Sequence, residues 1–337
     1  MFRTQFALNR FDWRSLDHFV ADVKLSESFG YGYALNPFNA LGLRDPYVWL
    51  SFAAKATTKI RLGPFIDNPM LKHPAVTASS IATLDEISGG RALLGLGVGD
   101  TAVRMLGIKP ATVCELEIAT IIARQLLAGE AVSVGAERPA RMWNPRKVPV
   151  WIAAGGPKTL RMAGRIADGV FLRVGRHPKN LHHALENVRA GAAEAGRPAG
   201  EPSIGIVIHI ITSQEPAAIR SISRAMAAGF YEYSPVLFEN AGLNWTGPPV
   251  KELRTQVWPD FHHAEDSTRA GRVVDFLSED VAESFSLFGS ASNVAGQLRR
   301  ALAELPPVEI IVPHPVPVPS PDSRFKRWFA EKVMPAL

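Results

Sequence analysis

A glycine-rich stretch in the first third of the chain constrains the fold more than any other feature. Residues 85–100 read DEISGGRALLGLGVGD. The double glycine is typical of a helix end, and the apolar run after it predicts a strand buried on both faces, as in a parallel sheet. Gly95, Gly97 and Gly99 alternate along one face of that strand, so a flat group can approach its backbone closely. Tight packing of helix on sheet is the alternative explanation of such a glycine pattern.

Length and composition restrict the class of protein. The chain has 337 residues, a length that α/β barrels commonly reach as one domain, and 47% of the residues are hydrophobic. It has no apolar run long enough to cross a membrane, and residues 1–9 lack the hydrophobic centre of a signal peptide. The only cysteine, Cys114, excludes internal disulfides and is typical of a reducing compartment. We therefore expect a cytoplasmic protein with no membrane partner.

Charged residues and histidines argue against two further classes. The formal net charge of +5 comes from dispersed arginines rather than from a basic block, so we expect no nucleic acid partner. The nine histidines include no HExxH spacing, and we expect no metal site. The positive charge is compatible with an anionic ligand.

Strand-like and helix-like segments alternate along the whole chain. Eight segments are predicted as strands: 4–8, 31–35, 60–66, 92–96, 148–154, 169–174, 203–212 and 308–312. Eight strand–helix repeats indicate an α/β TIM barrel, and the glycines after strands four, five and six lie at the strand ends where barrel active sites lie. A doubly wound open sheet would have its glycine fingerprint after the first strand, where this chain has none. We expect one domain, 1–337.

Two segments are expected to lie outside the regular repeat. Residues 230–285 combine several short helical patterns with proline-rich breaks, so we interpret them as a helical insertion. The proline-rich run 306–321 is expected to follow the last strand and to lead into a terminal helix over 323–333.

Two long motifs carry a resemblance to a known family. HPAVTASSIATLDEISGGRALLGLGVGD (73–100) and VPVWIAAGGPKTLRMAGRIADGVF (148–171) are similar to the bacterial luciferase-like oxidoreductases. Within that family they resemble the deazaflavin (coenzyme F420) branch that includes methylenetetrahydromethanopterin reductase. Weaker likeness extends over 44–69 and 284–305. The resemblance implies a TIM barrel, hydride transfer between coenzyme F420 and a small organic substrate, and a homodimer.

The resemblance also implies which residues hold the cofactor. The expected cofactor-binding residues, all at strand ends, are Phe65, Ile66, Gly97, Val98, Gly99, Asp100, Ala154, Gly155, Gly156, Val174, Gly175 and Arg176. In similar enzymes the pair matching Phe65-Ile66 forms a bulge with a non-proline cis peptide against the ring. The segment at Gly155-Gly156 matches a phosphate loop, and backbone N–H groups at a helix start suit an anion in any case.

The chain departs from the family pattern after the second strand. Relatives in the deazaflavin branch usually carry an Asp-His pair there, whereas this region contains Asn36 and Asn39. An asparagine cannot act as a general base near neutral pH, so Asp100 is the remaining ionisable candidate for acid or base catalysis. His209 lies within a predicted strand, where a core histidine is expected unless its side chain faces the site.

Three functions stay open on the sequence. The first is an F420-dependent oxidoreductase, for which we name Asp100, Asn39 and Asn36 as catalytic candidates. The second is an FMN-dependent monooxygenase that uses molecular oxygen, because the same fold accommodates both reactions. The third is a catalytically idle cofactor-binding protein, which the missing Asp-His pair makes worth testing.

Overall fold

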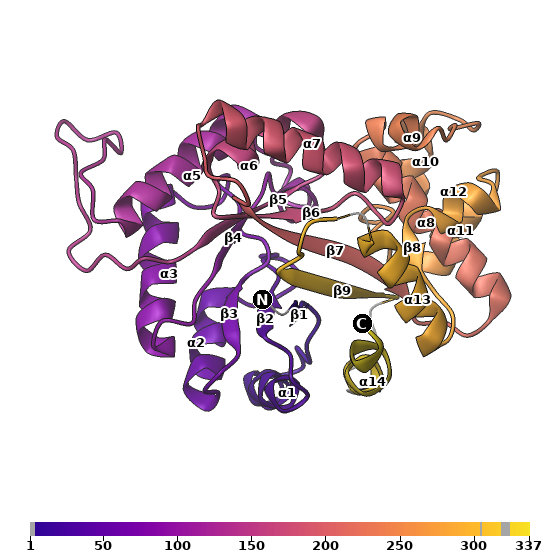
Figure 1. Ribbon diagram of the computed structural model, residues 1–337, viewed down its shortest axis with the longest axis horizontal. Coiled ribbons are helices and arrows are strands. Elements are labelled where there is room, and N and C mark those ends of the chain that lie inside the picture. The colour runs from indigo at the N-terminus through magenta and orange to yellow at the C-terminus, as the bar shows by residue number, and fades with distance from the viewer. Residues whose placement is uncertain (1–3, 304, 318–323) are drawn as a thin grey trace.

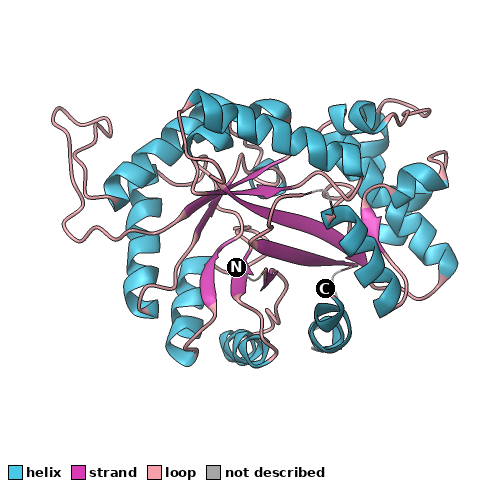
Figure 2. Cartoon of the chain, in the orientation of Figure 1, coloured by secondary structure: helices cyan, strands magenta, loops and turns pink. Residues whose placement is uncertain are grey.

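The computed structural model describes residues 4–303, 305–317 and 324–337, and its strands form one parallel barrel surrounded by helices (Figures 1 and 2). The strands are β1 Gln5–Leu8, β2 Tyr33–Asn36, β3 Arg61–Pro64, β4 Leu94–Leu96, β5 Val150–Ala154, β6 Gly169–Leu172, β7 Ser203–Ile211, β8 Ser286–Leu287 and β9 Ile310–Val316. The sheet runs in the order β3-β2-β1-β9-β7-β6-β5-β4. Isolated parallel bridges Leu62–Ala92 and Asp67–Leu96 bring β3 and β4 together. The predicted TIM barrel is confirmed.

Helices lie between successive strands and cover the outside of the barrel (Figure 2). They are α1 Leu16–Ser28, α2 Pro46–Ala56, α3 Pro74–Ser88, α4 Thr101–Arg104, α5 Val113–Leu127, α6 Pro157–Ile166, α7 Pro178–Glu194, α8 Pro216–Tyr233, α9 Val236–Ala241, α10 Val250–Leu253, α11 Ser267–Val273, α12 Glu279–Glu283, α13 Ala291–Leu302 and α14 Arg324–Trp328, with short 3-10 or π turns η1 Arg254–Gln256, η2 Phe329–Val333 and η3 Met334–Ala336. No helix in the described ranges is long and apolar enough to span a bilayer.

Local sequence signals set where several helices begin. Asp45 caps α2, because its carboxylate accepts hydrogen bonds from the backbone N–H groups of Tyr47 and Val48. Five helices, α2, α3, α6, α7 and α8, open with a proline, which suits the first turn because the N–H that proline lacks has no partner there. Gly89 closes α3 in the left-handed conformation expected of it.

The structure differs from the sequence predictions at a few element boundaries. The last barrel strand is β9 and reaches Val316, because prolines at 313 and 315 leave it extended and paired with β7. A two-residue strand, β8, pairs with the end of β7 and is too short to give a periodic pattern. The helix predicted over 323–333 is divided into α14 and η2, and η3 follows it. Part of the proline-rich run, and the first residue of that helix, lie outside the described residues.

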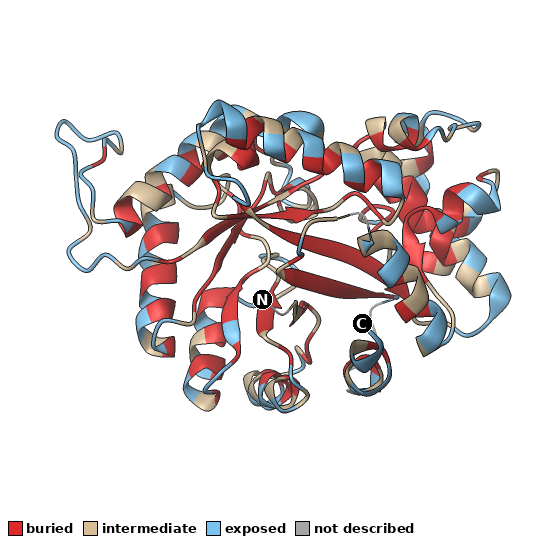
Figure 3. Ribbon diagram, in the orientation of Figure 1, coloured by how far each residue is buried: buried red, intermediate tan, exposed pale blue. Residues whose placement is uncertain are grey.

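The barrel interior changes from apolar to polar toward the C-terminal strand ends. Most strand residues are buried, with exceptions at strand starts such as Gln5 and Arg61 (Figure 3). The apolar interior cluster consists of Ala7, Tyr33, Leu35, Leu93, Trp151, Phe171, Val207, Ile310 and Val312. Side chains alternate along a strand, so residues two positions further on point inward too. These residues are Asn9, Arg173, His209 and His314. His209 and His314 are register partners on β7 and β9, which makes them neighbours in the barrel.

Closure of the barrel between β3 and β4 depends on a glycine. A Cβ at Gly63 would collide with the carbonyl oxygen of Leu93. We expect Gly63→Ala to lower the free energy of unfolding by about 1–3 kcal/mol, the usual cost of overpacking. Gly296→Ala in α13 is the matched control: its Cβ meets only the end of Arg300, and alanine is the better helix former by up to about 1 kcal/mol. Urea denaturation measures both, and equal midpoints for the two variants would contradict this account of closure.

Candidate active site

A cavity of about 310 Å³ opens at the C-terminal ends of the strands. Its wall combines strand ends, the loops after β2 and β3, the start of α4 and the segment between η1 and α11. The lining residues are Asn9, Arg10, Pro37, Phe38, Asn39, Leu43, Phe65, Ile66, Gly99, Asp100, Thr101, Ala102, Met105, Ala153, Arg173, Val207, Tyr233, Trp258, Pro259, His263, Glu265 and His314. Five residues named from the sequence are among them: Asn39, Phe65, Ile66, Gly99 and Asp100.

The bulge after β3 forms one wall of the cavity. The Phe65–Ile66 peptide bond is a non-proline cis bond, as the resemblance implied. A Cβ at Gly97 would collide with the side chain of Ile66, and one at Gly95 would lie 2.5 Å from the carbonyl oxygen of Pro64. The glycines of β4 therefore make room for the neighbouring bulge, which corresponds to the packing explanation of their pattern. Gly99 differs, since it lines the cavity with a φ of +74°.

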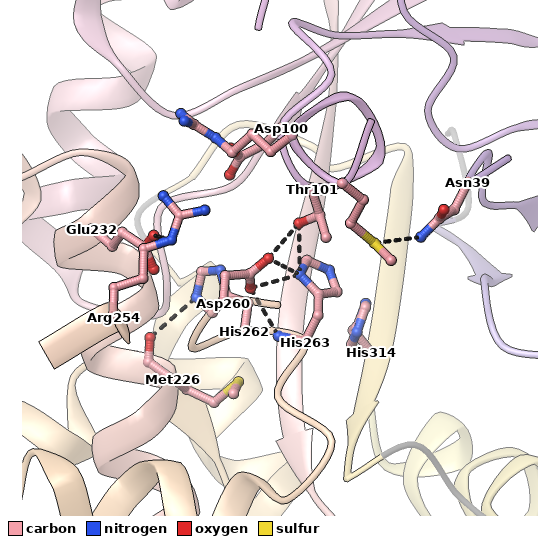
Figure 4. A network of polar contacts seen from close by, with 12 residues as sticks. Asn39, Asp100, Thr101, Met226, Glu232, Arg254, Asp260, His262, His263 and His314 are labelled. Carbon is pink, nitrogen blue, oxygen red and sulfur yellow. Dashed lines mark hydrogen bonds and ion pairs between the residues drawn. The ribbon is translucent and has the colours of Figure 1, made fainter. Parts of the chain in front are cut away.

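Asn36 and Asn39 have different surroundings. Asn36 is 1% exposed, and its side-chain oxygen accepts a hydrogen bond from the indole nitrogen of Trp13 at 3.0 Å. It does not line the cavity. Asn39 does line it: its amide nitrogen lies 3.6 Å from the sulfur of Met105, and its oxygen accepts from the backbone of Leu41 and Gly42 (Figure 4).

The predicted phosphate loop lies outside the main cavity, at the start of α6. Gly156 is the N-cap residue of α6 and Gly155 lines a smaller pocket beside it, together with Val174 and Asn180. Asn180 is 1% exposed, and neither atom of its amide group has a hydrogen-bond partner. Ala154, which precedes this loop, is buried. Val98, another residue expected to bind the cofactor, packs against the hydrophobic core.

Arg176 is bound to the protein backbone. Its Nε donates hydrogen bonds to the carbonyl oxygens of Glu283, at 2.5 Å, and Ser286, at 2.8 Å. The neighbouring Gly175 has a φ of +74°, and a Cβ there would lie 2.6 Å from the ring of Phe285. Gly175 and Arg176 therefore connect the C-terminal end of β6 to the segment around β8.

Asp100 is the N-cap residue of α4 and lines the cavity. Its side chain makes no capping hydrogen bond to α4 and instead forms an ion pair with Arg104, one helical turn later. The arginine balances the carboxylate charge beside the cavity (Figure 4).

A carboxylate, a histidine and a hydroxyl that the sequence analysis did not single out meet at the same wall. His263 Nδ1 lies 2.8 Å from Asp260 Oδ1, and Thr101 Oγ1 lies 2.5 Å from Asp260 Oδ2 and 3.0 Å from His263 Nδ1 (Figure 4). Burial raises the pKa of Asp260, but His263 and the Thr101 hydroxyl outweigh it and hold that pKa below its usual range. Asp260 therefore stays ionised and orients the imidazole.

Three buried histidines and two arginines occupy the floor of the cavity and its surroundings. The ring centroids of His262 and His314 lie 5.0 and 4.9 Å from that of His209. Burial, reinforced by Arg173 or Arg10, holds the pKa of each histidine well below its usual range, so all three are neutral. His209 thus belongs to the site surroundings, and its Nδ1 has no hydrogen-bond partner.

Sequence reasoning could have found part of this floor. Every second residue of a strand points into the barrel. Counting two residues on from the last apolar inward residue of four strands gives Asn9, Arg173, His209 and His314. No comparable signal marks Asp260 and His263, because an irregular segment between η1 and α11 carries them. In the described part of the chain, no group of three or more His, Cys, Asp or Glu side chains is arranged to hold a metal ion.

Comparisons with known proteins agree with this architecture. The family model described as luciferase-like monooxygenase matches residues 6–307. The 5,10-methylenetetrahydromethanopterin reductase of Archaeoglobus fulgidus is 30% identical over 328 residues, 94% of each chain. The solved coenzyme F420-dependent tetrahydromethanopterin reductase of Methanopyrus kandleri superposes with a TM-score of 0.76 at 25% identity, over 99% of both chains. A monooxygenase from Streptomyces bottropensis shares the fold, with a TM-score of 0.65 at 19% identity over 98% of this chain and 99% of that one. The chain belongs to the luciferase-like monooxygenase family.

Proposed function

We propose that this oxidoreductase transfers a hydride between coenzyme F420 and a small organic substrate. The observation that carries the proposal is the cavity wall formed by Phe65, Ile66 and Asp100 at the C-terminal end of the barrel, in a chain that aligns with the Archaeoglobus fulgidus reductase over 94% of its length. Bound F420 would supply the hydride-carrying carbon of its deazaflavin ring.

The residues present fit such a group. Phe65, Ile66, Ala153 and Val207 give the cavity an apolar wall suited to a flat ring, and a cavity of this volume is within the range of small-molecule sites. At the start of α6, the unpartnered amide of Asn180 and the backbone of Gly155-Gly156 suit phosphate oxygens. These residues would hold the ring and the phosphate respectively.

We propose that His263 supplies the proton that accompanies reduction of a polar double bond. Asp260 accepts a hydrogen bond from Nδ1 of this histidine, which leaves Nε2 as the nitrogen that exchanges a proton. Asp100 is the second candidate, but Arg104 already pairs with its carboxylate. Asn39 lines the cavity with only an amide side chain, and we assign it a role in substrate binding.

The choice of cofactor is testable by titration. We expect F420 to bind more tightly than FMN, because the Archaeoglobus fulgidus reductase aligns over 94% of this chain and the solved Methanopyrus kandleri reductase, which covers 99% of it, is F420-dependent. Fluorescence titration of the purified protein with each cofactor measures the two affinities. Tighter FMN binding together with oxygen-dependent turnover would instead support the monooxygenase alternative, and binding of F420 with no turnover on any acceptor would support an idle binding protein.

Two variants identify the group that transfers the proton. We expect His263→Gln to lower kcat by about a hundredfold to ten-thousandfold, the usual contribution of a positioned acid, with F420 affinity nearly unchanged. Asp260→Asn should act in the same direction through the orientation of the ring. Steady-state kinetics of these variants beside Asp100→Asn decides the assignment: a larger loss of kcat in Asp100→Asn would transfer the role to that carboxylate. Asn39→Ala should change KM more than kcat.

We also propose that the chain forms a homodimer through α2, α3 and α5. These helices are neighbours, and they expose large apolar side chains: Val48, Phe52, Val76, Ile118 and Ile121, each between 38% and 55% exposed. Clustered exposed apolar side chains are typical of a protein interface.

Light scattering after size-exclusion chromatography tests this assembly. We expect a dimer for the wild type and a monomer for Phe52→Glu, because a buried, unpaired carboxylate opposes association. Trp143→Glu is the control, since Trp143 is 98% exposed but lies in the connection between α5 and β5. A monomeric wild type, or an unaltered dimer in Phe52→Glu, would contradict the proposed interface.

A further inference from the structure

Two guanidinium groups line the cavity without a carboxylate partner among the described residues. Arg10 Nη2 donates a hydrogen bond to His314 Nε2 at 2.8 Å, and Arg10 Nε is buried with no partner. Arg173 Nη2 donates to His262 Nδ1 at 3.0 Å, and its guanidinium lies 5.5 Å from the ring centroid of Tyr233. Each arginine thus contacts neutral groups only.

The histidines cannot neutralise these charges. His262 Nε2 lies 3.1 Å from the carbonyl oxygen of Met226 and must donate to it, so Nδ1 accepts from Arg173 in a neutral ring. His314 Nε2 accepts from Arg10, which leaves the proton of the neutral ring on Nδ1, next to the amide of Asn9 at 2.9 Å. A half-turn of that amide lets its otherwise unpartnered oxygen accept from Nδ1.

The carboxylates around the cavity are paired with other groups or exposed to solvent. Asp260 is bound by His263 and Thr101, and Asp100 is paired with Arg104. Glu265 also lines the cavity but is exposed to solvent. The floor therefore carries two positive charges, and burial together with Arg173 lowers the pKa of Arg10 to about 10. A buried charge without a partner costs several kcal/mol, so a site of this kind is completed by an anion.

We propose that Arg10 and Arg173 form an anion-binding site on the cavity floor that takes a carboxylate-type oxyanion of a bound ligand. The site deepens the proposed function and rests on it, because the anion would be either a carboxylate of the substrate or the ionised edge of the cofactor ring. Arginine suits this role because its planar fork donates two parallel hydrogen bonds to a carboxylate. Arg10 lines the cavity, and its buried Nε has no hydrogen-bond partner within the protein.

Benzoate and its neutral amide, benzamide, probe the site. Isothermal titration at low salt is performed on the protein with and without F420. We expect benzoate to bind at least tenfold more tightly than benzamide, and Arg10→Gln and Arg173→Gln each to weaken benzoate binding at least tenfold, while retaining a hydrogen-bond donor toward the histidine. Arg10→Lys should restore part of the affinity, since it restores the charge. Arg189→Met, at an exposed position on α7, is the control and should bind benzoate like the wild type.

The same variants separate the two sources of the anion. If the substrate supplies it, benzoate binds the F420-loaded protein and F420 affinity stays the same in both glutamine variants. If the cofactor ring supplies it, benzoate competes with F420 and both variants lose F420 affinity. Equal binding of benzoate and benzamide, or no benzoate binding with unchanged F420 affinity in the variants, overturns the proposal. Failure of F420 to bind the wild type overturns the proposed function instead, and the benzoate titration of the cofactor-free protein still tests the site.

Discussion

The site depends on one constraint that a closed parallel barrel imposes. Every second side chain of each strand points into the barrel, and all of these side chains must pack in the same interior space. Over most of each strand these positions are apolar and fill the centre, with rings such as Trp151 and Phe171 packed at 4.7 Å between centroids. One step further, the same alternation places polar side chains where loops replace strands and water or ligand can enter. The last interior layer of the barrel thus contributes Asn9, Arg173, His209 and His314 to the cavity floor and its surroundings, and Arg10 joins them from the first turn of chain after β1.

The register explains why residues distant in sequence share hydrogen bonds. Asn9 follows β1, and His314 lies on β9, the neighbouring strand. The β1–β9 register continues to this pair, so two residues 305 positions apart meet at 2.9 Å. On the opposite side, the bulge after β3 is accommodated because β4 has no side chains at Gly95 and Gly97. The glycine pattern thus contributes to the site indirectly, by shaping the wall that carries Phe65 and Ile66.

The sequence predicted the fold well because the relevant signals are local. Apolar runs of strand length, Asp45-Pro46 at a helix start and Gly89 at a helix end each depend on a few consecutive residues. The site was predicted only in part. Phe65, Ile66 and Asp100 could be named from a resemblance, whereas Asp260 and His263 lie in an irregular segment whose path follows from tertiary packing alone. Asn36 was named as a catalytic candidate but does not line the cavity. The sequence could not show that its amide is hydrogen-bonded to Trp13, since that contact depends on tertiary structure.

The charges of the site are divided between its floor and its wall. On the floor, two arginines are bound to neutral histidines, and positive charge is left for a ligand. On the wall, two carboxylates have partners of their own: Asp100 has Arg104, and Asp260 has His263. This separation preserves the positive charge of the floor, since a free carboxylate there would neutralise the arginines. The segment after β2 agrees with this division, because Asn39, which lines the cavity where relatives carry an Asp-His pair, adds no negative charge to it.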